Sequence, residues 1–425
     1  MRLLHTSDWH LGQTFHGFDR QAEHQLFLDW LLRQILEQQP DLLLIAGDLF
    51  DTANPSAAAQ QQLYHFVTQA KACKADLQII MIAGNHDSAG RLEAPSPILQ
   101  VMGIDVVGTV KRDASGEIDI RPLVLPLRNG QNEVRGWCLA LPFLRPGDLP
   151  RVPDSKDQYA AGVAEIYARA LAHALELRGE AELPIIGMGH LHLTGGQTSE
   201  LSERRLIVGG NEALPASIFG QELAYVALGH LHKAQRVGAE HIRYCGSPLP
   251  MSFTEVNYQH QVLRVDFAGS ALQRVEALKI PRSVELLRVG TGLASGSSSA
   301  QAESALSVDE VLEQLAALEL KEVSPELQPF LEVSFVLAQP EPDLRQRVEQ
   351  ALAGKAVRLA RIQTRTSSTN PSHASISSLQ EMEQLRPEQV FASLYGKKYA
   401  DPMPDELKEA FATIATQALH AEAER

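Results

Sequence analysis

Short apolar runs alternate with amphipathic segments along the first hundred or so residues. The run at 41–46 is too continuously apolar for a half-exposed strand, so we predict a strand covered on both faces, with further strands at 2–6 and 77–83. The segments 19–38 and 56–72 carry apolar residues at helical spacing, with Pro40 ending the first helix and Ser56 capping the second. This strand–helix order predicts right-handed crossovers and a parallel sheet.

The same patterns continue and divide the chain into three predicted domains. Residues 1–280 hold further strands at 104–107, 121–125, 134–141, 183–188, 225–228, 241–245 and 261–267, and a helix at 159–177. Residues 281–366 read as a small α/β domain with strands at 284–289, 330–337 and 356–366, helices at 308–320 and 343–353, and a flexible Gly/Ser connector at 290–299.

The third predicted domain, 367–425, begins with a Ser/Thr/Pro-rich linker and continues with two amphipathic segments, 387–395 and 404–420. Their apolar faces suit packing on this chain's own body or a clamp around helices of another protein, and the sequence favours neither.

Polar side chains with metal-binding chemistry stand directly after several of the apolar runs. They occur in the motifs Asp-x-His, Gly-Asp, Gly-Asn-His-Asp and twice Gly-His-Leu-His, and comprise Asp8, His10, Asp48, Asn85, His86, His190, His230 and His232. The carboxyl ends of parallel strands are where α/β sheets bind ligands. Any one of these residues is commonplace after a strand, but their joint occurrence favours a metal site.

The residue types indicate which metals would suit this site. Residues two apart in a strand share a face, so Asp8 with His10, and His230 with His232, can each grip one ion together. Carboxylate, imidazole and amide oxygen form a set suited to Mn, Fe or Zn. With Asp48 as a bridge, the set would hold two cations about 3.5–4 Å apart, a geometry used in phosphoester hydrolysis.

Composition narrows the class of protein. The net charge of −14 over 425 residues argues against a nucleic-acid binder built on a broad basic surface, although bound cations and a local basic rim would still permit a nuclease. The three cysteines are scattered without paired spacing, which predicts a reducing compartment. With no signal-peptide pattern and no membrane-length apolar run, we expect a cytoplasmic protein.

The strand-end motifs resemble the signatures of the calcineurin-like metallophosphoesterases. Within that superfamily, the segments 4–12 and 46–51 and the order of the domains are similar to the SbcD family of bacterial DNA repair nuclease subunits. The resemblance is specific over residues 1 to about 246 and rests on length and layout beyond. It implies an α/β fold in which a four-layer metallophosphoesterase β-sandwich flanked by helices is followed by a small α/β capping domain and C-terminal helices.

The resemblance also implies roles for individual residues. One metal would be held by Asp8, His10, Asp48 and His232, and the second by Asp48, Asn85, His190 and His230. His86 would protonate or stabilise the leaving oxygen of a phosphodiester.

Three nearby residues take supporting roles or stay open. Asp51 is either a positioner of His86 or an ordinary turn residue. Asp87 is expected to hold the loop as a hydrogen-bond acceptor, and His192 to lie beside the metals or at the surface.

Substrate and partners follow from the same resemblance. We expect a Mn²⁺-dependent nuclease acting on DNA ends and hairpins as a homodimer, with an SbcC-type ATPase and a role in repair, replication and recombination. His16, Arg20 and Arg91, and also Arg145 and Arg151, lie on predicted loops that could rim the cleft and contact DNA. The alternatives are a phosphatase or small-molecule phosphodiesterase of the same superfamily, and a non-catalytic scaffold, against which the intact ligand set argues.

Overall fold

The computed structural model describes residues 1–198, 213–290 and 306–366, together with Phe391, Tyr395, Pro404, Leu407 and Phe411. The chain forms two compact units, Met1–Arg365 and Thr366–Arg425, and each is considered by itself. The predicted connector after Gly290, the linker and most of the two C-terminal segments lie outside the described residues. Within the second unit, Phe391, Tyr395, Leu407 and Phe411 are helical, and the rings of Phe391 and Phe411 stack with centroids 4.2 Å apart.

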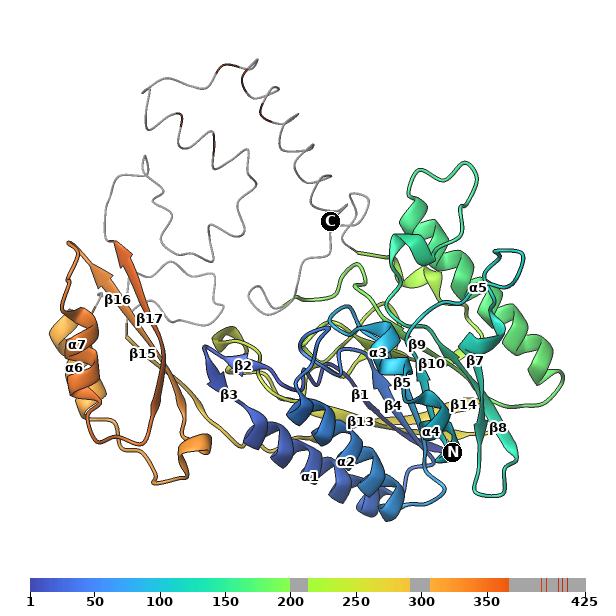
Figure 1. The fold of residues 1–425 in the computed structure, drawn as a ribbon, viewed down its shortest axis with the longest axis horizontal. Helices are drawn as coiled ribbons and strands as arrows, with labels where there is room; N and C mark the ends of the chain where they lie inside the picture. The colour runs from blue at the N-terminus through green and yellow to red at the C-terminus, as the bar shows by residue number, and fades with distance from the viewer. Residues whose placement is uncertain are drawn as a thin grey trace. The chain divides into compact units, whose positions relative to one another are not determined.

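The first sheet has the predicted parallel strands at its centre (Figure 1). Its strand order is β14-β13-β1-β4-β5-β6, with β1 (Arg2–Thr6), β4 (Leu42–Ala46), β5 (Gln78–Ile82) and β6 (Ile104–Val107) parallel to one another. On the other edge, β13 (Gln261–Ala268) runs antiparallel to β1 and pairs with β14 (Ala271–Lys279), a strand that the sequence analysis did not predict.

Helices α1 (Gln21–Gln38) and α2 (Ala57–Cys73) pack side by side on the outer face of this sheet (Figure 1). Leu43 and Ile45 of β4 meet the apolar side chains of both helices there. The hydroxyl of Ser56 accepts a hydrogen bond of 3.2 Å from the backbone N–H of Ala59 and caps α2, as predicted. Two short helices, α3 (Ala89–Glu93) and α4 (Ser96–Val101), follow β5.

The second sheet faces the first and is also parallel at its centre. Its order is β11-β12-β10-β9-β8-β7, formed by β7 (Val124–Arg128), β8 (Val134–Ala140), β9 (Ile185–His190), β10 (Leu223–Gly229), β11 (Gln235–Arg236) and β12 (Ile242–Tyr244). A 3₁₀ turn occupies Arg121–Leu123, so the strand predicted from residue 121 begins only at Val124. Pro122 explains this difference, because it suits the first turn of a helix and cannot donate to a strand ladder.

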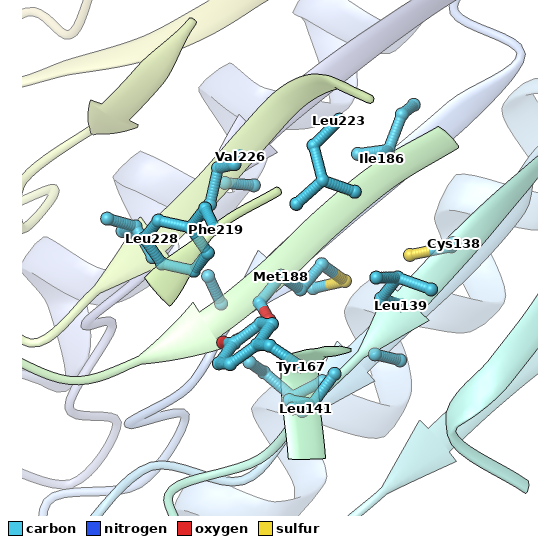
Figure 2. Close-up of a cluster of buried hydrophobic side chains, with 14 of the residues drawn as sticks. Cys138, Leu139, Leu141, Tyr167, Ile186, Met188, Phe219, Leu223, Val226 and Leu228 are labelled. Carbon is cyan, nitrogen blue, oxygen red and sulfur yellow. The ribbon is translucent and has the colours of Figure 1, made fainter. Parts of the chain in front are cut away.

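The main core lies between the two sheets and under α5 (Gln158–Arg178). Figure 2 shows part of it, where Leu139, Ile186, Met188 and Val226 pack beside Tyr167 of α5. The Tyr167 hydroxyl donates a hydrogen bond of 3.0 Å to the carbonyl oxygen of Met188, so its one polar atom is satisfied in the core. The layers are therefore helix, sheet, sheet and helix, which confirms the predicted sandwich.

A smaller sheet follows the sandwich, with the order β15-β16-β17 and bounds Leu286–Gly290, Phe330–Leu337 and Arg358–Thr366. Helices α6 (Val308–Ala316) and α7 (Leu344–Ala351) cover one face, where alternate residues of β16 such as Leu331 and Val333 are buried. The elements agree with the predicted small α/β region, while a domain boundary at residue 280 stays a prediction. Among the described residues, no helix is long and apolar enough to cross a membrane.

Candidate metal centre

The predicted metal-binding residues converge between the two sheets, at the carboxyl ends of the central strands. Asp8, Asp48 and Asn85 follow β1, β4 and β5 of the first sheet, while His190 ends β9 and His230 follows β10 of the second. The loops are tied together by backbone hydrogen bonds of 3.0 Å from the N–H of Asp8 to Gly47 and from the N–H of His10 to Asp48. Parallel strand order thus brings together side chains that are far apart in sequence.

Four of these residues adopt the left-handed backbone region that only glycine enters freely. Their φ angles are 54° at Asp8, 47° at His10, 48° at Asp48 and 100° at His230. Such conformations cost on the order of 1–3 kcal/mol each and persist where the surrounding structure imposes them, often at functional sites. The clustering of four in one place supports the view that function, more than stability, shaped these loops.

The glycines of the motifs are required by close packing around the same side chains. A Cβ atom at Gly84 would clash with the carboxylate and backbone nitrogen of Asp48, and one at Gly229 would clash with the carbonyl oxygen of Ala46. Gly47 has a positive φ of 88°, and a Cβ there would clash with the His190 ring. Glycine is therefore the residue that lets the two sheets bring their polar ends together.

The side chains form three overlapping clusters whose possible ligand atoms lie within 4.8 Å of one another. The clusters are Asp8, His10 and His232; His10, Asp48 and His86; and Asp8, Asp48 and His190. Oδ2 of Asp48 lies 3.7 Å from Nε2 of His10 and 3.3 Å from Nε2 of His190. Asp48 is thus placed as a bridge between the two halves of the site.

Asn85 lies where two histidines of the second sheet meet. Its Oδ1 atom is 3.0 Å from Nε2 of His190 and 3.1 Å from Nδ1 of His230. The other nitrogen of His190, Nδ1, donates to the carbonyl oxygen of Ala46 at 2.9 Å. This bond directs Nε2 of His190 to the centre and fixes the tautomer that a metal ligand needs.

His10 supplies the clearest sign that a cation fits this site. Its Nε2 atom is buried and has no hydrogen-bond partner among the described residues, whereas Nδ1 lies 3.2 Å from Oδ1 of Asp51. A buried polar atom without a partner is costly, and a bound metal would satisfy it. The mixture of carboxylate, amide and imidazole donors around it suits Mn, Fe or Zn.

Electrostatics at the centre also favour a positive charge. Burial raises the pKa of Asp48, but His190, with smaller effects from His10 and His86, outweighs burial and holds the pKa below its usual range. Burial likewise lowers the pKa of His190, and the charge and hydrogen bond of Asp48 reverse this and raise it to about 9. The buried carboxylate therefore draws a cation to itself, which is either a proton or a metal ion.

His86 is half-buried beside the cluster, with its ring 4.8 Å from that of His10 between centroids. Its backbone N–H donates to Oδ1 of Asp48 at 2.8 Å, and its Nδ1 donates to the backbone carbonyl oxygen of Asp51 at 2.7 Å. Nε2 is then the ring atom that can exchange a proton with a ligand.

Asp51 contacts two histidines through two different groups. Its carbonyl oxygen holds His86, while its carboxylate lies against Nδ1 of His10. The sequence analysis considered only an effect of Asp51 on His86, and the structure adds the contact with His10. Asp87 acts as the predicted loop-holding acceptor, because its carboxylate receives the backbone N–H groups of Gly84, Leu49 and Phe50.

His192 does not belong to the three clusters formed among the described residues. Its side chain is half-buried, and its ring lies 6.3 Å from that of His230 between centroids. This position next to a predicted ligand is one of the two that the sequence analysis left open.

Two buried residues that support the site escaped the sequence analysis. Ser7 donates a hydrogen bond of 2.5 Å to Oδ2 of Asp8, and the signal was its place directly before the motif. Glu255 is fully buried, with Oε1 3.6 Å from Nδ1 of His232. No local pattern around Glu255 points to this contact. Both hold a predicted ligand in place, as carboxylates and hydroxyls behind metal-binding residues commonly do.

Of the DNA-contact candidates, Arg20 is wrong. Its side chain is 1% exposed and forms a two-pronged pair with Glu23, while Nη1 donates to the side chain of Gln13 and the carbonyl oxygen of Pro250 at 2.7 Å each. The guanidinium joins two parts of the sandwich and cannot reach a ligand. The partner was readable, since Glu23 lies one helical turn after Arg20.

The other candidates are exposed. His16 has a φ of 50° and lies against the rings of Phe15 and Phe253. Arg91 lies on α3 rather than on a loop, at the rim of a pocket of about 400 Å³ that Phe50 and Tyr64 also line. Arg145 and Arg151 are exposed on the segment between β8 and α5, as predicted.

Comparison with known proteins agrees with the geometry. The family model described as Calcineurin-like phosphoesterase matches residues 1–234, and one described as Type 5 capsule protein repressor C-terminal domain matches residues 302–399. A relative from Rhodobacter capsulatus, named as the SbcD subunit of the nuclease SbcCD, is 37% identical over 93% of this chain and 94% of its own length.

Proteins of the same name from Escherichia coli K12 and Bacillus subtilis 168 are also similar. They are 38% and 34% identical over 66% and 63% of this chain, and over 68% and 66% of their own lengths. The chain therefore belongs to the calcineurin-like phosphoesterases, a family of metal-dependent hydrolases of phosphate esters, and within it to the SbcD nuclease subunits.

Proposed function

We propose that this chain is the nuclease subunit of an SbcC-type ATPase complex and cuts DNA with two divalent ions, most favourably Mn²⁺. The observation that carries the proposal is the convergence of carboxylate, amide and imidazole donors on Asp48, from both sheets. Asp8, His10, Asp48 and His232 would hold one ion, and Asp48, Asn85, His190 and His230 the other. Bound there, the ions would activate water for attack on phosphorus and neutralise charge on the phosphate.

The protein's own part in the reaction centres on His86. The hydrogen bond from Nδ1 to the Asp51 carbonyl leaves Nε2 to carry the second proton, which suits donation to the leaving oxygen. The backbone bond from His86 to Asp48 fixes this ring relative to the bridging carboxylate. Asp51, through its carboxylate, would orient His10 for its ion.

The substrates that this proposal assigns are DNA ends and hairpins, with exonuclease action on duplexes and endonuclease action on hairpins and single strands. The relatives are named as subunits of the nuclease SbcCD, and this name supports both the nuclease activity and the ATPase partner. We further propose a homodimer, a partner-binding role for residues 367–425, and action in DNA repair, replication and recombination.

The test uses purified full-length protein with Mn²⁺, blunt duplex and hairpin DNA, with and without the ATPase subunit. Bis-para-nitrophenyl phosphate serves as a small phosphodiester control. We expect cleavage of DNA in the complex and slower hydrolysis of the small ester by the chain alone. Turnover of the small ester without cutting of DNA in any mixture would instead support a small-molecule phosphodiesterase, and no turnover of either substrate would support a scaffold.

A further inference from the structure

Arg145 is an exposed cation held close to the second half of the metal centre. The backbone N–H of Phe143 donates to the carbonyl oxygen of Ala83 at 2.8 Å, which anchors this loop just before Gly84 and Asn85. The Phe143 ring meets the His190 ring edge-on, with centroids 6.4 Å apart. The Arg145 guanidinium lies 5.5 Å from the Phe143 centroid, so a cation–π contact holds it beside the site.

Lys233 stands in a similar position beside the first half of the centre. It directly follows His232, and its ammonium lies 5.6 Å from the centroid of the Tyr258 ring. Its Nζ also donates to the side-chain oxygen of Gln197, which is neutral. Both contacts orient the ammonium without cancelling its charge.

Neither cation has an acidic partner within the part of the chain that the structure describes. The carboxylate of Asp148 receives the backbone N–H of Arg145 and makes no ion pair with its guanidinium. By contrast, exposed Arg121 pairs with Asp119 at 2.8 Å and exposed Arg236 with Glu240 at 2.6 Å. On a chain of net charge −14, unpaired cations oriented beside a cluster of metal ligands point to an anionic ligand.

We infer that Arg145 and Lys233 bind the backbone phosphates of a DNA strand on the two sides of the phosphate that is cut. The inference rests on the proposed nuclease function and deepens it. Arg145 borders the side of His190 and Asn85, and Lys233 borders the side of His232, so a strand crossing the centre meets a cation before and after it. Contacts to phosphates position a strand without reading its sequence, which suits a nuclease that cuts ends of any sequence.

The test measures DNA cleavage by full-length Arg145→Ala and Lys233→Ala in the ATPase complex as a function of salt. Each variant should raise KM for DNA about tenfold with little change in kcat, because a charge-assisted hydrogen bond to the substrate is lost. The log–log salt dependence of kcat/KM should flatten by about 0.7 for each lost contact to a single strand. Arg145→Lys should retain most of that salt dependence.

Arg121→Ala is the matched control, since it removes an exposed arginine that already has an acidic partner. It should leave KM and the salt dependence at wild-type values. Wild-type KM and salt dependence in both test variants, on DNA that the parent protein cuts, would overturn this inference alone. Equal losses on bis-para-nitrophenyl phosphate would also overturn it, because they would indicate damage to the metal centre. A parent protein that turns over the small ester but does not cut DNA would overturn the proposed function.

Discussion

Nδ1 of His86 donates a hydrogen bond of 2.7 Å to the backbone carbonyl oxygen of Asp51, while the Asp51 side chain lies 3.2 Å from His10. The main chain of one residue thus fixes the proposed proton donor, and its side chain supports a proposed ligand. The two functions can be separated, because a substitution at position 51 removes the carboxylate and keeps the carbonyl.

His86→Ala should abolish cleavage and keep the metals. The loss of one proton donor lowers turnover by about 10²–10⁴-fold, whereas the seven proposed ligands are untouched. Turnover on hairpin DNA and manganese content after dialysis are the two measurements. A variant that comes out of dialysis without metal would show that position 86 supports the ions directly.

Asp51→Ala should show the opposite pattern. The carbonyl that holds His86 remains, but His10 loses its carboxylate partner, so manganese affinity should fall about 10–100-fold. At saturating manganese, kcat should recover towards the wild-type value. Isothermal titration with Mn²⁺ and activity against metal concentration provide the check, and a kcat that stays low at saturation would contradict it.

Gly84→Ala should destroy the metal centre, because the new methyl group would clash with the carboxylate and backbone nitrogen of Asp48. Gly90→Ala, six residues later in α3, is the control, since a Cβ atom there meets no other atom within 4 Å. The first variant should lose manganese binding, and the second should match or slightly exceed the wild type in stability. Metal binding by titration and thermal unfolding distinguish them.

Stability should fall in acid because of a histidine between the sheets. His5 accepts from the Tyr225 hydroxyl through Nδ1 and donates to the Leu228 carbonyl oxygen through Nε2, and burial lowers its pKa to about 3. The folded pKa lies below the unfolded value of 6.5, so this contribution is complete above pH 6.5 and is lost as the pH falls towards 3.

The loss amounts to roughly 1.4 kcal/mol per pH unit for this one proton. Urea unfolding at pH 7 and at pH 5 measures it, with His5→Gln as the comparison. The variant should start from lower stability and show a pH slope smaller by about one proton. Parallel slopes would mean that His5 does not titrate on unfolding.

The strand ends were predictable because apolar runs, glycines and ligand-type residues follow one another locally in the sequence. The conformations of Asp8, His10 and Asp48 were not, since nothing in their residue types favours a positive φ, and packing of distant loops imposes it. Glu255 was hidden for a similar reason, because it reaches His232 only after the chain has folded back.

Two other differences have local causes. Arg20 was taken for a surface residue on general grounds, although the salt bridge with Glu23 removes it from solvent. Strand β14 alternates, but among its nine residues none is buried, so its apolar signal was weak. In both cases the partner mattered more than the residue type.

Because the polar ends of two separate sheets meet at Asp48, neither sheet alone contains a complete centre. The strand that leads into His230 emerges late in synthesis, and β13, which borders β1, comes later still. A nascent or proteolytically shortened chain therefore lacks the means to damage a chromosome. Nuclease activity is withheld until nearly the whole sandwich has been made and closed.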